Sequence, residues 1–265
     1  MNNLLDRMRV EGKVAIVTGA GRGVGRGIAL ALASGGAKVV CSARSAKEIA
    51  ETVAMIKAQG AESVPIIADV MDEQQLQNLV DRTVEEYSGI DIIINNAGGN
   101  DYAPFLETTT DSFKYHFDWN TTSAFTLSRI ATPWMLKRGG GSIINISSAA
   151  GHIGIRGMMA YCVAKAGLDQ LTRCMAEELA PKIRVNCLAL GSIMTPALQK
   201  TFDLEEGFRE KLESKTPLQC VGNAENVGLA ALFLCSEAGS YCTGAILNID
   251  GGIQDTNLPF RLPDL

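Results

Sequence analysis

Seven short segments rich in β-branched residues recur along the chain, and most are followed by a longer stretch whose apolar residues have helical spacing. Most of these segments are apolar throughout, which is typical of parallel strands covered on both faces. The helical stretches supply the long crossovers that parallel strands need. The pattern predicts an α/β, doubly wound fold with a seven-stranded parallel sheet and helices on both faces. The expected strands are residues 14–17, 38–41, 63–67, 90–94, 142–146, 183–190 and 246–249.

Length and composition are those of one packed domain. The chain has 265 residues, of which 46% are hydrophobic and 20% are charged, and this is ordinary usage for a globular fold. We therefore expect a single domain over residues 1–265 that ends in a C-terminal tail, residues 253–265. Helix-capping signals agree with the predicted α/β pattern. Asp72 and Gln75 have capping-box spacing, and Gly35, Gly60 and Gly89 fall where helices should end.

Net charge and cysteine content limit which partners and which cellular location the sequence predicts. The net charge is −5, without a block of like charges, so neither nucleic acid nor an anionic membrane is an expected partner. No stretch approaches the roughly 20 apolar residues of a membrane span, and the first residues lack a signal core. The seven cysteines form no C-x-x-C pair, so we expect reduced thiols in a cytoplasmic protein. With only two histidines and no clustered ligands, no metal site is expected.

A glycine-rich loop joins the first expected strand to the first helix. Residues 18–25 read Thr-Gly-Ala-Gly-Arg-Gly-Val-Gly. Such a loop points free N–H groups at one spot, where the positive end of the helix dipole favours a pyrophosphate, and glycine allows the ligand to come close. At this junction the loop predicts dinucleotide binding in a Rossmann-type domain. The loop residues expected to contact the nucleotide are Gly19, Gly21, Arg22, Gly23, Val24 and Gly25.

The end of the second strand indicates which dinucleotide is preferred. NAD-binding chains carry a carboxylate about 20 residues after the loop, which accepts hydrogen bonds from the ribose hydroxyls. This chain reads Cys-Ser-Ala-Arg-Ser at 41–45, without a carboxylate. Arg44, with Arg22 from the loop, suits a 2′-phosphate because planar guanidinium donors match its oxygens. The sequence thus predicts NADP(H) in preference to NAD(H); the alternative is that both arginines are solvated surface charges.

Several motifs in order resemble the short-chain dehydrogenase/reductase family over about residues 10–252. They are TGAGRGVG at 18–25, Asp69, NNAG at 95–98, Asn120, Ser148, Tyr161-Cys-Val-Ala-Lys165, IRVN at 183–186 and DGG at 250–252. The resemblance implies that Tyr161 is the general acid/base, that Lys165 lowers its pKa and holds the nicotinamide ribose, and that Ser148 binds the substrate carbonyl. It also implies that Asn120 holds a water in the proton relay. Further implied cofactor contacts are Asp69, Val70, Asn96, Ala97, Gly98, Ile193 and Thr195.

Elementary electrostatics agrees with these implied roles. A free tyrosine has a pKa near ~10, too high for ready proton exchange near neutrality. A lysine ammonium at ~4 Å, with an effective dielectric constant of ~20, contributes about 4 kcal/mol, or roughly 3 pKa units. Ser147 remains an alternative to Ser148, and neither Cys162 nor His152 is expected to act directly. The family's usual Pro-Gly after the sixth strand is Leu190-Gly191 here, which predicts a less constrained backbone beside the nicotinamide.

Loops beyond the strand ends should contact the substrate. Residues 99–105, 149–159 and 195–218, the last acting as a lid, supply mostly apolar side chains. They suit a small-molecule alcohol or ketone of bulky apolar character, and the chain looks most like bacterial hydroxysteroid dehydrogenases acting on bile acids. The alternatives are a 3-oxoacyl-[acyl-carrier-protein] reductase and a non-enzymatic NADP-binding sensor. The resemblance also implies a homo-oligomer, a tetramer built through the helices around Asn120 and Tyr161.

Overall fold

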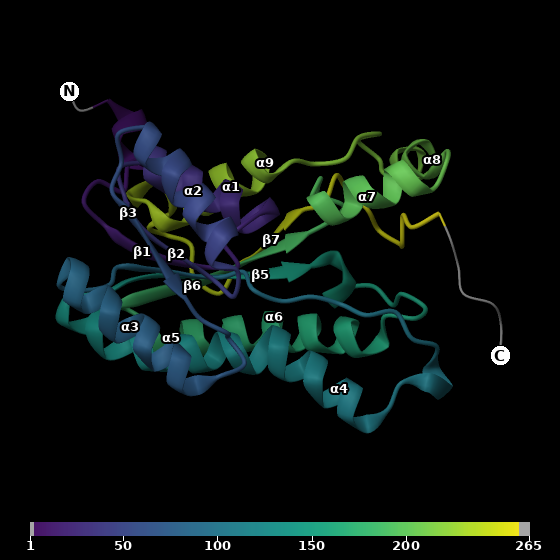
Figure 1. Cartoon of the computed structure of the whole chain (residues 1–265), viewed down its shortest axis with the longest axis horizontal. Helices are drawn as coiled ribbons and strands as arrows, with labels where there is room; N and C mark the ends of the chain where they lie inside the picture. The colour runs from purple at the N-terminus through teal and green to yellow at the C-terminus, as the bar shows by residue number, and fades with distance from the viewer. Residues whose placement is uncertain (1–2, 260–265) are drawn as a thin grey trace.

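A seven-stranded parallel sheet forms the centre of the molecule (Figure 1). The computed structural model describes residues 3–259, so residues 260–265 of the expected tail lie outside the described part. The strand order is β3-β2-β1-β4-β5-β6-β7, and it reverses between β1 and β4, where a crevice for a ligand opens at the carboxyl ends. This architecture confirms the predicted fold. The strands are β1 (Val14–Thr18), β2 (Lys38–Ala43), β3 (Ser63–Ile67), β4 (Ile92–Asn95), β5 (Gly141–Ser148), β6 (Ile183–Leu190) and β7 (Ile246–Ile249).

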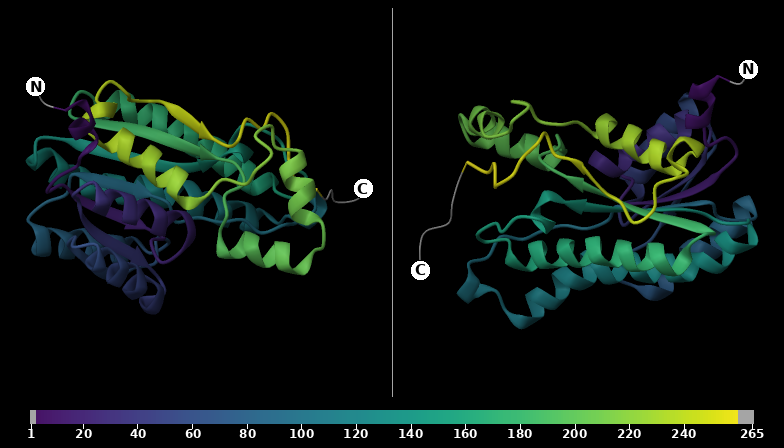
Figure 2. Two further views of the ribbon diagram at one scale, coloured as in Figure 1. Left: turned by 90° about the horizontal axis from the view of Figure 1, so that it is seen from above. Right: turned by 180° about the vertical axis from the view of Figure 1, so that it is seen from behind.

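Helices cover both faces of the sheet, and each layer has its own core. Figures 1 and 2 show one layer above the sheet and a second below it, in which the long helix α6 runs along the strands. Ile28 and Leu32 are fully buried in the upper core, and Leu79 and Leu127 are buried in the lower one. The upper layer is α1 (Gly23–Ser34), α2 (Ala46–Ala58) and α9 (Ala224–Cys235); the lower layer is α3 (Glu73–Tyr87), α4 (Thr110–Phe117), α5 (Ser123–Lys137) and α6 (Met159–Leu179).

Two further helices, α7 (Pro196–Leu204) and α8 (Phe208–Ser214), stand beyond the carboxyl ends of the strands. Their segment leaves and rejoins the fold at one place, because Ile193 and Gly222 form a parallel bridge. Met194 N donates to the carbonyl of Gly222 at 2.7 Å, and Gly222 N donates to the carbonyl of Ser192 at 3.0 Å. The base of this segment is therefore fixed to the sheet. Among the described helices, none has the length and apolar character needed to cross a bilayer.

Some element boundaries differ from the sequence-based expectations. Strand β5 runs on to Ser148, two residues past its expected end, because its two serines pair with Ala189 and Leu190 of β6. Helix α3 ends at Tyr87, and its C-cap is Ser88, whose φ of 61° is left-handed, and not Gly89. The chain therefore makes its turn one residue earlier than the glycine suggests.

A ladder of buried amides joins the sheet to the lower layer. The Nδ2 of Asn95 donates to Ser128 Oγ at 3.0 Å and to Asn145 Oδ1 at 2.8 Å. The Nδ2 of Asn145 in turn donates to Thr172 Oγ1 at 2.9 Å. Since buried polar groups are costly unless they are bonded, this ladder fixes α5 and α6 against β4 and β5, and so fixes the helix that carries Tyr161.

Candidate active site

The glycine loop forms a cradle at the N-terminus of α1. The N-cap residue, Arg22, makes no side-chain capping bond, so the first N–H groups of the helix are not capped by that side chain. A Cβ on Gly25 would lie 2.3 Å from the carbonyl oxygen of Gly19, and Gly19 and Gly23 have left-handed φ values of +63° and +53°. Only glycine fits these positions without strain. The cradle therefore fits the pyrophosphate of a dinucleotide.

A groove runs from this cradle across the switch point of the sheet. Its first part has a volume of about 640 Å³ and its second about 200 Å³, and the two share Val24, Asn96, Gly98 and Thr195. The structure thus brings together, along one groove, every residue that the sequence predicted for the cofactor. The first part is lined by Gly19, Gly21, Arg22, Gly23, Val24, Gly25, Arg44, Asp69, Val70, Asn96, Ala97, Gly98 and Thr195, and the second adds Tyr161, Lys165 and Ile193.

Both predicted arginines line the groove, and each lies near an acidic residue. Arg22 Nη1 is 3.4 Å from Glu48 Oε1, and Arg44 Nη1 is 3.9 Å from Asp69 Oδ2. Glu48 was not identified from the sequence, because it lies in α2 and meets the loop only through packing. The signal that could have revealed it is its place in the first turn after the cap Ser45, a turn that faces the carboxyl edge of the sheet.

Three of the four predicted catalytic side chains meet in the second part of the groove. Ser148 ends β5, Tyr161 and Lys165 lie one turn apart on α6, and the Tyr161 phenol is hydrogen-bonded to Ser148. Lys165 Nζ lies 5.5 Å from the centre of the Tyr161 ring and donates to the carbonyl of Ile146 at 2.8 Å. Ser147 instead donates its hydroxyl to the carbonyl of Lys165 at 3.3 Å. The geometry favours Ser148 over Ser147 as the group that faces a substrate.

Burial sets the acidity of both groups. It raises the pKa of Tyr161 to about 12, and the hydrogen bond with Ser148 opposes that rise. Burial also lowers the pKa of Lys165 to about 8, which the negative charge of Asp169 partly offsets. The expected lowering of the Tyr161 pKa by Lys165 is therefore wrong for this structure. The reason is that desolvation of the phenol dominates, while Nζ makes its hydrogen bond to Ile146.

Asn120 lies beside this site in a turn of π-helix, Asp118–Thr122. Its Nδ2 donates to the carbonyls of Gly99 and His116, each at 2.9 Å, and its Oδ1 accepts from Gly99 N at 3.1 Å. The side chain thus clasps the loop that follows β4. π-Helical turns recur at functional sites, and no sequence signal predicted this one.

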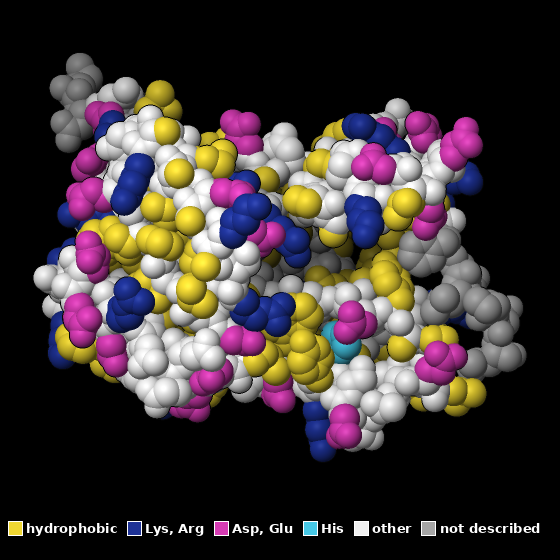
Figure 3. Space-filling model, in the orientation of Figure 1, with side chains coloured by type: hydrophobic (Ala, Val, Ile, Leu, Met, Phe, Trp, Pro, Cys, Tyr) yellow, Lys and Arg dark blue, Asp and Glu magenta, His cyan; other side chains and the backbone are white. Residues whose placement is uncertain are grey.

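The loop that follows β4 carries exposed hydrophobic side chains. Loops 99–105 and 149–159 are joined by a hydrogen bond of 3.0 Å from Ala103 N to the carbonyl of Gly157. Tyr102 and Phe105 are 49% and 64% exposed there. Figure 3 shows this face hollowed between the layers, with basic and acidic side chains side by side at the rim.

The backbone after β6 is more constrained than the missing proline suggested. Leu190 pairs with Ser148 of β5 and with Ile249 of β7, and Gly191 N donates to the carbonyl of Ile249 at 3.0 Å. A Cβ on Gly191 would lie 2.6 Å from Asp250 Cα. The sheet therefore supplies the constraint that we expected to be lost with the proline.

Comparisons with known proteins agree with this site. Residues 19–254 match a family model described as Enoyl-(Acyl carrier protein) reductase. The chain is 38% identical to the 7alpha-hydroxysteroid dehydrogenase of Escherichia coli strain K12 over 254 residues, which cover 95% of this chain and 98% of that protein. It is 35% identical to the 3-oxoacyl-[acyl-carrier-protein] reductase of Thermotoga maritima, with 93% and 99% covered.

A solved structure shares the same sequence identity with this chain. It is a 7alpha-hydroxysteroid dehydrogenase complexed with NADH and 7-oxo glycochenodeoxycholic acid, which superimposes with a TM-score of 0.90 at 38% identity. The match covers 96% of this chain and 99% of that one. With a nucleotide groove that leads to a serine, a tyrosine and a lysine, the chain belongs to the short-chain dehydrogenase/reductase family and is an oxidoreductase that interconverts alcohols and ketones with a nicotinamide cofactor.

Proposed function

We propose that the protein is an NADP(H)-dependent oxidoreductase that interconverts a secondary alcohol and a ketone on a bulky apolar substrate, a hydroxysteroid such as a bile acid. The observation that carries the reaction is the hydrogen bond between Tyr161 and Ser148, beside Lys165, in the groove that leads from the glycine loop. The 7alpha-hydroxysteroid dehydrogenase relative supports the substrate class.

The side chains of the site have complementary roles in this proposal. Ser148 donates a hydrogen bond to the substrate oxygen, and Tyr161 passes a proton to that oxygen in reduction or takes one in oxidation. Lys165 holds the nicotinamide ribose with its ammonium, while Asn120 holds a water in the proton relay. The nicotinamide ring, when bound, supplies or accepts the hydride.

The cofactor would lie along the groove with its pyrophosphate on the glycine loop. Gly19, Gly21, Gly23, Val24 and Gly25 form that loop. Towards the adenine end, Asp69 and Val70 would contact the base, and towards the ring, Ile193 and Thr195 would contact the carboxamide. The strand-end residues Asn96, Ala97 and Gly98 lie beneath, and all of these line the groove.

The preference for NADP(H) rests on Arg22 and Arg44. Both line the adenosine end of the groove, and the end of β2 carries no carboxylate to accept the bonds of a ribose 2′-hydroxyl. Each guanidinium is more than half exposed, so it can turn toward a 2′-phosphate, which planar donors bind well.

Segment 195–218 is proposed as the substrate lid. It carries α7 and α8 and is tied at its base by the bridge between Ile193 and Gly222. Phe202 and Phe208 stack within it at 6.0 Å between ring centres. A paired base and a helical body are what a segment needs to move as a unit over a substrate. Residues 1–265 would then act as one domain, with the tail beginning at residue 253.

A second candidate is 3-oxoacyl-[acyl-carrier-protein] reduction, which the Thermotoga relative favours. An acyl carrier protein is acidic and is usually met by a basic surface, whereas this chain has a net charge of −5. Absorbance at 340 nm with bile acids, simple steroids and acetoacetyl thioesters separates the two. We expect turnover with steroid substrates; thioester reduction without steroid turnover would overturn the substrate proposal.

Assembly into a homotetramer is also proposed. Apolar side chains on the outer face of α4, α5 and α6 are exposed, at 41% for Tyr115, 45% for Phe125 and 42% for Val163. Adjoining helices with such a face suit a second copy of the chain. All seven cysteines are free thiols, which supports a cytoplasmic location.

A further inference from the structure

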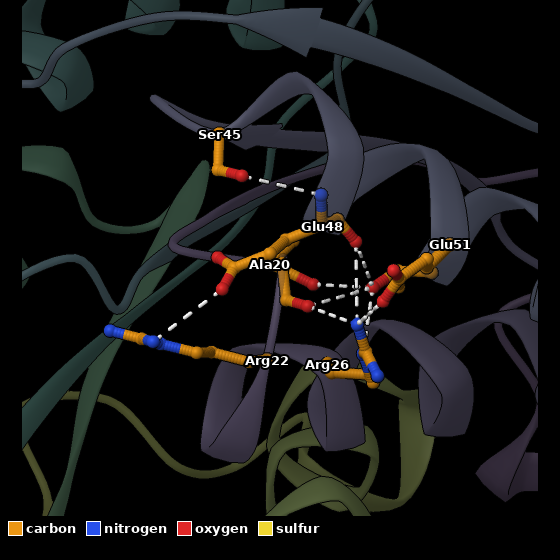
Figure 4. A network of polar contacts seen from close by, with 8 residues as sticks. Ala20, Arg22, Arg26, Ser45, Glu48 and Glu51 are labelled. Atoms are coloured by element: carbon orange, nitrogen blue, oxygen red, sulfur yellow. Dashed lines mark hydrogen bonds and ion pairs between the residues drawn. The ribbon is translucent and has the colours of Figure 1, made fainter. Parts of the chain in front are cut away.

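Glu48 lies at the adenosine end of the groove, with its side chain against the glycine loop (Figure 4). A Cβ on Gly21 would come within 2.8 Å of Glu48 Cβ and 3.1 Å of Glu48 Oε2. The other carboxylate oxygen, Oε1, is 3.4 Å from Arg22 Nη1. The Glu48 side chain is 35% exposed, against 67% for Arg22. Glu48 is therefore the more buried member of the ion pair.

The backbone of Glu48 is held within the first turns of α2 and is linked to the loop region through Arg26 and Thr52. Its N–H is capped by Ser45 Oγ at 3.3 Å, and its carbonyl accepts from Thr52 Oγ1 at 3.2 Å and from Arg26 Nη2 at 3.4 Å. Thr52 Oγ1 also bonds to the carbonyl of Ala20 at 2.9 Å. The first turn of α2 cannot withdraw from the loop without losing the bonds from Arg26 to Glu48 and from Thr52 to Ala20, and these keep the Glu48 carboxylate beside Arg22.

Formal charges in this part of the groove cancel. Two arginines, Arg22 and Arg44, face two acids, Glu48 and Asp69. A phosphate monoester carries roughly −1.5 to −2 at neutral pH, so a 2′-phosphate gains from the arginines and loses from the acids. A ribose 2′-hydroxyl is instead a donor that a carboxylate accepts. The Glu48 carboxylate therefore weakens the binding of NADP(H) and strengthens the binding of NAD(H).

We propose that Glu48 is a specificity-determining residue of the nucleotide site: it holds Arg22 in an ion pair that a 2′-phosphate must break, and it thereby admits NAD(H) beside NADP(H). The inference deepens the proposed function, since it rests on nucleotide binding in this groove. It concerns the ratio of the two affinities and not which nucleotide wild type prefers.

The test compares Glu48→Gln with Glu51→Gln. Glu51 is a matched control, because it is one turn further along α2 and pairs with Arg26 at 3.2 Å outside the groove. Dissociation constants for NADP+ and NAD+ are measured by titration calorimetry without substrate, and 2′,5′-ADP and 5′-AMP probe the adenosine end alone. We expect Glu48→Gln to raise the NADP+/NAD+ affinity ratio about tenfold, and Glu51→Gln to change it less than about twofold.

A double-mutant cycle identifies the route of the effect. If Glu48 acts by holding Arg22, the change in ratio caused by Glu48→Gln should fall by more than half in an Arg22→Gln background. The full effect in that background would overturn the ion-pair mechanism. Thermal unfolding of each variant confirms that the fold is intact.

Failure of this inference and failure of the proposed function are distinguishable. A wild type that binds NAD+ more tightly would overturn the NADP(H) preference but leave the expected shift in Glu48→Gln. An unchanged ratio in Glu48→Gln, or equal shifts in Glu48→Gln and Glu51→Gln, would overturn the role of Glu48 whichever nucleotide the wild type prefers.

Discussion

His152 Nε2 lies 2.9 Å from Asp169 Oδ2. This contact ties the turn after Ser148 to α6, one turn beyond Lys165. The Asp169 side chain is 4% exposed, and its other oxygen accepts from Cys187 Sγ at 3.4 Å. The turn approaches α6 so closely that a Cβ on Gly151 would lie 2.8 Å from Asp169 Oδ2. The pair therefore positions the strand end that carries Ser148.

Replacing His152 tests this relationship. We predict that His152→Ala lowers the free energy of unfolding by about 1–3 kcal/mol, because a buried carboxylate loses its polar partner. Urea denaturation measures the loss. In an Asp169→Asn background the same change should cost much less, since no buried charge remains to be stranded. Equal costs in the two backgrounds would show that His152 acts by packing alone.

Loss of the Tyr161 hydroxyl should remove catalysis and leave nucleotide binding nearly unchanged. We predict that Tyr161→Phe lowers kcat by at least about 10³-fold, because no other group supplies the proton, while cofactor affinity changes less than about threefold. Initial rates at 340 nm and nucleotide titration check the two parts. Tyr241→Phe, at a fully exposed position, is the control and should match wild type. Retained turnover in Tyr161→Phe would refute the acid/base assignment.

The pKa of Tyr161 predicts different pH profiles for the two directions of reaction: a flat one for reduction and a rising one for oxidation. With that pKa raised to about 12 by burial, the phenol is protonated through neutrality and is ready to act as the acid in reduction. Oxidation needs the phenolate, whose fraction grows about tenfold per pH unit below the pKa. We therefore expect kcat/KM for oxidation to rise from pH 7 to 10. An oxidation profile that is flat over this range would contradict the prediction.

Arg44 should matter for one nucleotide more than for the other. We predict that Arg44→Ala weakens NADP+ binding by about tenfold or more and NAD+ binding by less than about threefold, because only the former carries the phosphate that a guanidinium binds. Arg173→Ala, on the exposed face of α6, controls for loss of positive charge. Equal weakening of both nucleotides would mean that Arg44 contacts a shared part of the cofactor.

The amide ladder should contribute measurably to stability. Asn145→Leu removes one of the two hydrogen bonds that the buried Nδ2 of Asn95 donates and the one that Thr172 Oγ1 accepts, so we predict a loss of about 2–4 kcal/mol in the free energy of unfolding. Denaturant titration measures it. Asn78→Leu on the surface of α3 is the matched control. A loss below about 0.5 kcal/mol would contradict a structural role for the ladder.

The sheet and the nucleotide groove could be predicted because local signals define them. The runs at Ser63–Ile67, Ile183–Leu190 and Ile246–Ile249 have the predicted bounds, since their β-branched and apolar residues favour strands. The glycine loop is marked by backbone needs that only glycine meets.

Features that depend on packing between distant segments could not be predicted. Glu48 reaches the loop 26 residues before it only because α2 folds back onto α1. Ser147 and Ser148 are strand residues because β6 pairs with them, although their polarity marks a strand end in the sequence. The protonation of Tyr161 depends on burial, which the spacing to Lys165 does not report.

The two hydrogen bonds between Asn120 and Gly99 fix the start of the loop that follows β4. Asn120 holds one end of the loop at Gly99, and a second bond, from Ala103 N to the carbonyl of Gly157, ties residues 100–107 to the loop before α6. The same segment carries Tyr102, whose charge helps to raise the pKa of Tyr161, so a substitution there would alter the proton donor together with the entrance to the site.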